Sequence, residues 1–154
     1  MRKFPKTLVV AVVLVASAFA ALAVRAAAPA GRYVVAADTV LDTKTGLTWQ
    51  RAVPKANHSW AEAGTYCQTL DLAGFATGWR LPTKKELESL VDLRTSLPCI
   101  DTAAFPNTSG YSYFWTSTVS GQDPSRVYMV FFYDGNTITT FKASQNNFLT
   151  RCVR

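Results

Sequence analysis

The sequence predicts an α+β domain in which two helices come early and an antiparallel sheet follows. Two Ser/Thr-x-x-Glu helix starts, Ser59–Glu62 and Thr83–Glu86, lie close together near the middle of the chain. β-rich runs flank Asp134-Gly135-Asn136 in the second half, a pattern typical of a hairpin. The chain has 154 residues, 49% of them hydrophobic and 17% charged. These values suit one globular domain and argue against a disordered chain.

Residues 1–28 are predicted to be a signal peptide. Arg2, Lys3 and Lys6 precede the uncharged, Ala-rich run Leu8–Val24, and small residues follow that run. This is the layout of a secretory signal and is typical of bacterial export. An uncleaved membrane anchor is the alternative, because the run is close to the minimum length for spanning a bilayer. In both cases we expect residues 29–154 to fold as one domain outside the cytoplasm, in the periplasm or secreted to the cell surface.

The charge distribution argues against nucleic acid as a partner. The whole chain has a formal charge of +6, but four of its sixteen basic residues lie in the first thirty positions, which hold no acid. The remainder therefore has twelve basic and ten acidic residues, a net charge of +2. Beyond the pair Lys84-Lys85 it has no block of basic residues that could follow a phosphate backbone.

The first part of the domain is predicted to be extended. β-prone residues occur at Tyr33–Val35 and Thr39–Leu41, and Asp42–Gly46 has turn chemistry. Leu47–Gln50 then alternates apolar and polar residues, as a half-buried strand does.

Two helices are predicted next. In the first, which begins at Ser59, Trp60, Ala63, Cys67 and Leu70 recur at helical spacing, so Cys67 is expected to face the core. We expect this helix to end near Gly74. The second begins at Thr83 and has an apolar stripe of Leu87, Leu90 and Val91. A long polar loop, 93–110, follows it.

The last third of the chain is predicted to form the sheet as a meander. Its expected strands are Phe114–Thr118, Arg126–Tyr133, Thr137–Phe141 and Phe148–Val153. Cys152 lies in the last of these.

Seven segments spread over residues 33–154 carry a resemblance to a known family. They are Asp42–Gln50 (DTKTGLTWQ), Ser59–Cys67 (SWAEAGTYC), Leu72–Asp92 (LAGFATGWRLPTKKELESLVD), Ile100–Asn107 (IDTAAFPN), Phe114–Thr118 (FWTST), Phe132–Asn136 (FYDGN) and Arg151–Arg154 (RCVR). In these segments the chain resembles the C-terminal domain of the Legionella collagen-like adhesin.

The resemblance implies a C-type-lectin-like fold, related to that of formylglycine-generating enzymes. It implies a twisted antiparallel sheet with long loops, in which the N- and C-terminal strands are adjacent. A disulfide between Cys67 and Cys152 is implied as well, which leaves Cys99 as the odd thiol. Five residues of the family's motifs are interpreted as scaffold: Trp49, Trp79, Arg80, Pro82 and Trp115.

We expect no catalytic residue. The only histidine, His58, is interpreted as a solvated loop residue without a partner. Four carboxylates are weaker candidates for acid–base chemistry: Glu86, Glu88, Asp92 and Asp101. Oxidation of the formylglycine type requires dedicated reactive cysteines, and the implied disulfide leaves only Cys99. A secreted enzyme or enzyme accessory remains the alternative from another class.

No cofactor or metal site is predicted. The chain has no Cys-x-x-Cys pair and one histidine, which argues against zinc. The Glu-Pro-Asn or Gln-Pro-Asp signature of calcium-dependent lectins is absent. A hairpin turn is the simpler interpretation of Asp134–Asn136. A calcium site there is the alternative.

The leading interpretation is a non-catalytic, adhesin-like domain that binds an extracellular glycan or a surface protein. Sugar recognition combines aromatic faces with planar hydrogen-bonding groups. Such groups gather in two polar segments, as the candidate ligand-binding residues Asn107, Tyr111, Tyr113, Gln122, Asp123, Arg126, Gln145, Asn146 and Asn147. The alternative is that the Asn and Ser residues form turns and that Tyr113, Trp115 and Phe131 pack in the core.

Two further interpretations concern the ligand. Four basic side chains could attract an anionic polysaccharide: Arg126, Lys142, Arg151 and Arg154. The resemblance supports this interpretation, since the collagen-like adhesin binds sulfated glycans. A structural envelope component that makes only protein–protein contacts is the remaining alternative.

Overall fold

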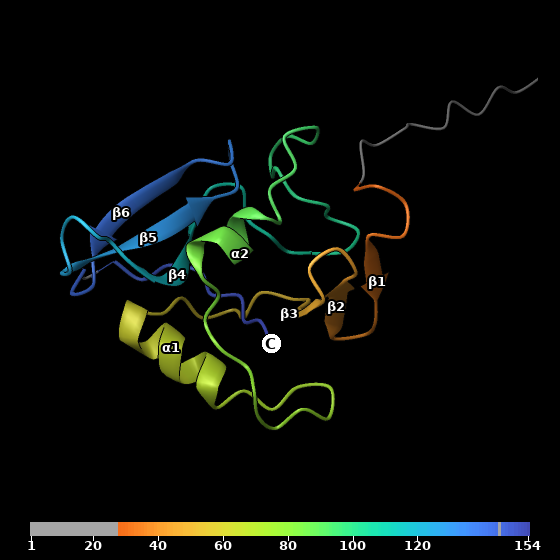
Figure 1. The fold of residues 1–154 in the computed structure, drawn as a ribbon, viewed down its shortest axis with the longest axis horizontal. Helices are drawn as coiled ribbons and strands as arrows, with labels where there is room; N and C mark the ends of the chain where they lie inside the picture. The colour runs from red at the N-terminus through yellow and green to blue at the C-terminus, as the bar shows by residue number, and fades with distance from the viewer. Residues whose placement is uncertain (1–27, 145) are drawn as a thin grey trace, which may run out of the picture.

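The computed structural model describes residues 28–144 and 146–154 (Figure 1). Within these residues the chain is a mixed α+β protein, as predicted, with two helices and two antiparallel sheets of three strands each. The helices are α1 (Trp60–Gln68) and α2 (Lys84–Glu88). The strands are β1 (Tyr33–Val35), β2 (Thr39–Asp42) and β3 (Leu47–Gln50) in the first sheet, and β4 (Tyr113–Val119), β5 (Arg126–Phe131) and β6 (Thr137–Phe141) in the second.

The prediction of one sheet was wrong, because β1–β3 and β4–β6 form two separate sheets. The expected last strand, Phe148–Val153, does not extend the meander either. Residues 148–154 run between the two sheets and change partner along their length (Figure 1). Near one end, the Leu149 N–H donates to the Tyr113 carbonyl of β4 (3.0 Å). Near the other, the Gln50 N–H of β3 donates to the Cys152 carbonyl (2.9 Å). The C-terminal segment therefore connects the sheets, and it pairs with β3 rather than with the first strand, β1.

Helix α1 begins at the predicted residue and ends earlier than predicted. The Ser59 hydroxyl accepts from the Glu62 N–H and the Glu62 carboxylate accepts from the Ser59 N–H, which completes the predicted capping box. The helix closes at Thr69, and a separate turn between Leu72 and Phe75 precedes Gly78. Cys67 is fully buried, as its helical spacing predicted.

The disulfide joins Cys67 to Cys152, as the resemblance implied. Both cysteines are fully buried, and the bridge ties α1 to the C-terminal segment. Cys99 is a free, buried thiol that donates to the Tyr133 carbonyl (3.3 Å).

Helix α2 is short, but its apolar side chains are placed as predicted. It is capped by Thr83 and Glu86, and Leu87 and Leu90 are buried against the second sheet. Leu90 lies beyond the helix in a turn closed by its N–H and the Leu87 carbonyl (3.1 Å).

The core lies on both faces of the second sheet. Phe114 and Val130 face the α2 side, in a cluster with Trp49 and Leu87. Trp115, Met129 and Val127 share the other cluster with Trp79, Ala63 of α1 and the disulfide. Four of the five predicted scaffold residues are buried, and Arg80 is the exposed exception.

Arg80 instead forms an exposed ion pair that gives a testable pH dependence. Its guanidinium donates to both carboxylate oxygens of Glu86 (2.6 and 2.8 Å), and the same carboxylate accepts from the Thr83 N–H (2.7 Å). The hydrogen bonds from Arg80 are the main cause that lowers the pKa of Glu86 from 4.5 to about 2.

We expect Glu86→Gln to be less stable than the native chain at neutral pH, although glutamine can still complete the capping box. A folded-state pKa below the unfolded value stabilises the fold above pH 4.5, and this contribution is lost as the pH falls towards 2. The stability difference between the two proteins should therefore shrink across that window. Thermal unfolding at stepped pH measures it, and a difference that does not change with pH would contradict the ion pair's role.

The buried Arg151 corrects one expectation. Its side chain is fully buried, donates to the Thr108 hydroxyl (2.7 Å) and lies 4.7 Å from the centre of the Phe105 ring. Burial lowers the pKa of this guanidinium, because it disfavours the charge. Arg151 cannot meet a polysaccharide, so its predicted role in attracting one was wrong.

The predicted signal peptide comprises residues 1–28. All of it except Ala28 lies outside the described residues. Within residues 28–144 and 146–154, none of the helices has the length and apolar character needed to cross a membrane.

Candidate ligand-binding surface

A row of five aromatic side chains lies at one end of the second sheet, and we call it the aromatic ridge. The rings of Tyr113 and Phe131 stack with centroids 4.4 Å apart, and Phe131 stacks on Tyr133 at 5.5 Å. The ridge continues to Tyr111, 5.9 Å from Tyr133, and to Phe148, 5.8 Å from Tyr113. Tyr111 is 74% exposed and Tyr133 is 44% exposed, so one end of the ridge is open to solvent.

The register of the sheet explains why these rings meet. Tyr113 of β4 and Phe131 of β5 are directly opposite in the antiparallel pair. Tyr133 follows Phe131 by two residues and lies on the same side, while the intervening Phe132 is fully buried on the other. The ridge is thus the end of a sheet face whose middle, at Trp115 and Met129, belongs to the core cluster beneath α1.

The C-terminal segment adds the last ring and two amides. The hydrogen bond from the Leu149 N–H to Tyr113 places Phe148 against both Tyr113 and Trp115. Asn146 and Asn147, immediately before it, are exposed. Their backbone is tied to the loop before α1, where the Asn57 amide donates to the Asn147 carbonyl (3.3 Å).

The long loop carries the exposed end of the ridge. Asn107, another predicted ligand residue, is exposed in this loop and has a positive φ of 58°. A Cβ on Gly110 would lie 3.5 Å from the Cα of Leu97, so the loop packs backbone against backbone just before Tyr111. Leu97, at 50% exposure, and Leu93, at 74%, lie in the same loop.

The structure divides the predicted ligand residues between two places. Tyr111 and Tyr113 are in the ridge, and Asn146 and Asn147 are next to it in the chain. A second group is in or beside the turn between β4 and β5: Gln122, Asp123 and Arg126. That turn is at the far end of β4, about 20 Å from Tyr113 at roughly 3.3 Å per residue. Gln145 lies outside the described residues.

The second group forms a closed turn. The Asp123 carboxylate accepts from the N–H and the hydroxyl of Ser125 (2.9 and 2.6 Å), and these bonds lower its pKa. The Arg126 guanidinium donates to Thr139 and lies 4.2 Å from the centre of the Phe141 ring. Asp123 is therefore engaged by Ser125 of the same turn.

The other two basic side chains expected to attract a polysaccharide also lie over aromatic rings. The Lys142 ammonium is 5.2 Å from the centre of the Trp60 ring, and the Arg154 guanidinium is 3.6 Å from that of Phe75. Each of these two cations is therefore engaged in a cation–π contact within the chain.

His58 is not the solvated residue that was predicted. It is half-buried, its Nδ1 is 3.2 Å from the Thr150 hydroxyl, and its ring stacks on Tyr66 with centroids 4.9 Å apart. Its backbone also exchanges hydrogen bonds with Phe148. His58 therefore anchors the C-terminal segment beside the ridge.

Each candidate acid–base carboxylate is hydrogen-bonded within the chain. Glu86 binds Arg80, and Glu88 accepts from the Thr137 hydroxyl. The other two bind their own neighbours in sequence: Asp92 binds Arg94, and Asp101 binds the N–H groups of Ala103 and Ala104. Hydrogen bonds lower the pKa of Glu86 and of Asp92, the opposite of what a general acid at neutral pH needs.

The Asp134–Asn136 segment is a tight turn. The Asp134 carboxylate accepts from the Asn136 N–H (3.0 Å), and Gly135 has a φ of 79°. A Cβ on Gly135 would lie 2.7 Å from the Val91 side chain, so a larger residue would force that side chain to move. Among the residues that the structure describes, no group of three His, Cys, Asp or Glu side chains is placed to hold a metal ion.

The sequence alone did not identify three members of the ridge. Tyr113 and Tyr111 were predicted as ligand residues, but Phe131, Tyr133 and Phe148 were not. The spacing of Phe131 and Tyr133 in a predicted strand was a usable signal, since residues two apart share a face.

Comparison with known proteins gives one match. A family model described as the Lcl C-terminal domain matches residues 38–154. No curated protein and no solved structure matches the chain. The matched range contains every described element except β1.

Proposed function

Because the chain belongs to the Lcl C-terminal domain family, we propose that it is an exported, adhesin-like binding domain that recognises glycans outside the cell. The observation that carries this proposal is the aromatic ridge, with Tyr111 and Tyr133 at its exposed end. Contiguous exposed aromatic surface on a folded domain marks an interaction site. The ridge coincides with part of the surface that the sequence predicted.

The chemistry of the ridge suits sugar rings. A tyrosine offers an apolar ring face and a hydroxyl that can donate or accept, so it can stack on the C–H face of a pyranose and bind its hydroxyls. The amides of Asn146 and Asn147, beside Phe148, add paired donors and acceptors. No charged side chain belongs to the ridge, so the proposed contact is made chiefly with the neutral parts of the glycan.

The proposal includes a C-type-lectin-like fold. Two features support it: the disulfide from α1 to the C-terminal segment, and the pairing of that segment with β3 in the N-terminal sheet. The long loop and the sheet beside it, which carry the ligand in many proteins of that fold, are also the elements that form the ridge here.

We propose the periplasm or the cell surface as the location. A disulfide between two buried cysteines is typical of proteins that fold in oxidising compartments. The family, named for an adhesin, supports the same location.

A non-catalytic role is part of the proposal. Its support is that His58 and the four candidate carboxylates are engaged by neighbouring groups of the chain. Binding through an aromatic surface requires none of them to donate or accept a proton.

The exposed leucines favour a second candidate, contact with a surface protein. Leu93 and Leu97 extend the apolar surface of the loop that carries Tyr111. Under this candidate a protein partner binds the ridge, and soluble glycans do not compete with it.

A glycan array probed with the full-length protein, with and without calcium, tests the proposed function. We expect saturable binding to a defined set of glycans and the same set in the presence of a chelator. Binding that needs calcium would contradict recognition through the ridge alone. An array without binding, obtained with folded and disulfide-bonded protein, would overturn glycan recognition and favour a protein partner.

A further inference from the structure

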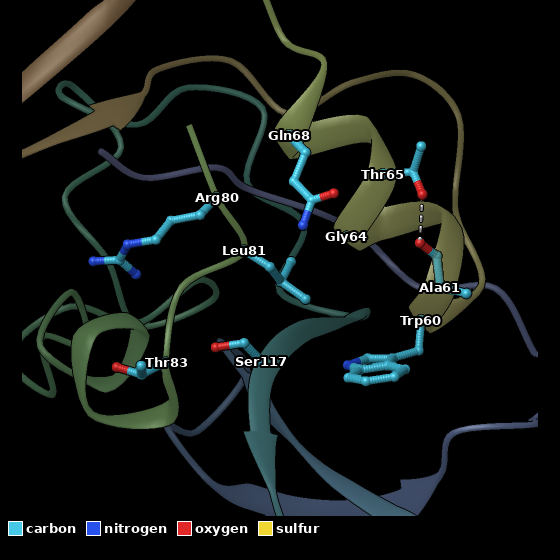
Figure 2. Close-up of a pocket in the computed structure, with 9 residues that line it drawn as sticks. All are labelled: Trp60, Ala61, Gly64, Thr65, Gln68, Arg80, Leu81, Thr83 and Ser117. Carbon is cyan, nitrogen blue, oxygen red and sulfur yellow. Dashed lines mark hydrogen bonds between the residues drawn. The ribbon is translucent and has the colours of Figure 1, made fainter. Parts of the chain in front are cut away.

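A concave feature separate from the aromatic ridge lies beside α1 (Figure 2). It is a groove of about 560 Å³ between α1, the segment 80–83 and β4. We call it the α1 groove. Its main lining residues are Trp60, Gly64, Thr65, Gln68, Leu81 and Ser117. The volume is in the range of small-ligand sites, and the groove shares no residue with the aromatic ridge.

The apolar part of the groove is rigid. The Trp60 indole N–H donates to the Thr116 carbonyl of β4 (2.9 Å), which fixes the ring and leaves it no free donor. Leu81 is buried and forms the floor between α1 and β4 (Figure 2). A ligand therefore meets a fixed aromatic ring beside an aliphatic floor.

The polar groups of the groove select for ligands that donate hydrogen bonds. The Thr65 hydroxyl donates to the Ala61 carbonyl (3.2 Å), and the Ser117 hydroxyl donates to the Pro82 carbonyl (3.2 Å). Since each hydroxyl has one hydrogen and has used it, both oxygens can only accept from a ligand. The Gln68 amide, which Figure 2 shows directed towards Leu81, offers donors and an acceptor.

The one cation of the lining is already neutralised. Arg80 is paired with Glu86 through two hydrogen bonds, and Figure 2 shows its guanidinium directed away from α1. A carboxylate or sulfate at the Thr65 and Ser117 hydroxyls would meet acceptor oxygens, and the Lys142 ammonium is held over the Trp60 ring, 5.2 Å from its centre. The ligand class that fits is neutral, rich in hydroxyl donors and apolar on one face, which describes a pyranose ring.

The glycine at position 64 is a further feature that points to a ligand in the groove. It lies in the middle of α1, where glycine destabilises a helix relative to alanine. Its φ is not positive, and a Cβ there would meet nothing within 4 Å, so neither the backbone nor the packing of the fold requires glycine. The missing side chain leaves the helix backbone accessible from the groove.

We propose that the α1 groove is a subsite for one neutral pyranose ring of the glycan. The inference rests on the proposed function and adds to it a contact site separate from the ridge. A glycan that occupied both sites would be held by an extended surface, from the long loop to α1.

The test is a ¹H–¹⁵N NMR titration of the full-length protein with the methyl glycosides of glucose, galactose, mannose and N-acetylglucosamine at millimolar concentrations. We expect saturable shifts of the Gly64 amide and the Trp60 indole N–H with at least one glycoside. Filling the groove by Gly64→Leu should weaken that binding at least about tenfold. The same variant should raise the thermal midpoint, because leucine is the better helix former.

The matched control is Gly121→Leu, in an exposed loop where a Cβ also meets nothing within 4 Å. It should bind the glycoside as the native chain does. Absence of shifts with all four glycosides, shifts confined to the ridge, or native affinity in a folded Gly64→Leu protein would each overturn the subsite.

The failures of the two proposals are distinguishable. Array binding that needs Tyr111 and Tyr133 and survives Gly64→Leu would overturn the subsite and leave the proposed function intact. Glycoside shifts at Gly64 combined with an array without binding would support the subsite and overturn the proposed recognition through the ridge.

Discussion

Replacing both Cys67 and Cys152 by alanine is expected to lower the free energy of unfolding by about 2–5 kcal/mol. The bridge closes a loop with a sequence separation of 85 residues, and in the chain-entropy model a long loop gives a large stabilisation. It also holds the C-terminal segment against α1, and that segment connects the two sheets. Loss of the bridge should therefore affect the whole fold rather than one end of it.

Denaturant unfolding followed by tryptophan fluorescence measures this difference. Cys99→Ala is the matched control, because it removes a buried thiol that takes no part in the bridge. We expect the control to lose less than about 1 kcal/mol. Equal stability of the double variant and the native chain would contradict the role of the bridge.

Truncating Trp115 to alanine is expected to cost about 3–5 kcal/mol. The side chain is fully buried in β4, and its indole N–H donates to the His58 carbonyl (2.7 Å). Its ring also contacts Phe148, with centroids 5.0 Å apart. The variant thus opens a cavity beneath α1 and removes the support of one ring of the aromatic ridge.

Trp115→Phe is the control for this prediction. Phenylalanine keeps an aromatic ring beside Phe148 and loses the hydrogen bond to His58, whose carbonyl retains the Phe148 N–H as a donor. We expect the phenylalanine variant to lose clearly less stability than the alanine variant in the same denaturant series. Equal losses would show that the hydrogen bond, not the packing, carries the contribution of Trp115.

Local features of the fold could be predicted where a short pattern determines them. Both capping boxes were predicted because the partners are three residues apart, and the Asp134–Asn136 turn because its chemistry is local. The burial of Cys67 followed from the helical period. The pairing of Cys67 with Cys152 came from the family resemblance, since spacing alone does not determine connectivity.

Features that depend on distant segments could not be predicted. The C-terminal segment runs between the two sheets and has partners more than a hundred residues away, such as Trp49 for Val153. The burial of Arg151 against Phe105 depends on how the long loop folds. The distance between Asp123 and Tyr113 follows from the length of β4. The α1 groove forms only where α1, the segment 80–83 and β4 meet.

The most direct test of the central claim uses the glycan that the native chain binds most tightly on the array. Its affinity is measured for the native chain and for the double variant Tyr111→Ala/Tyr133→Ala. Both side chains are exposed, so the double variant should fold, and Phe141→Ala, an exposed aromatic of β6 outside the ridge, is the control. We predict at least about tenfold weaker binding for the double variant and native affinity for the control. Native affinity in the folded double variant would contradict recognition through the aromatic ridge.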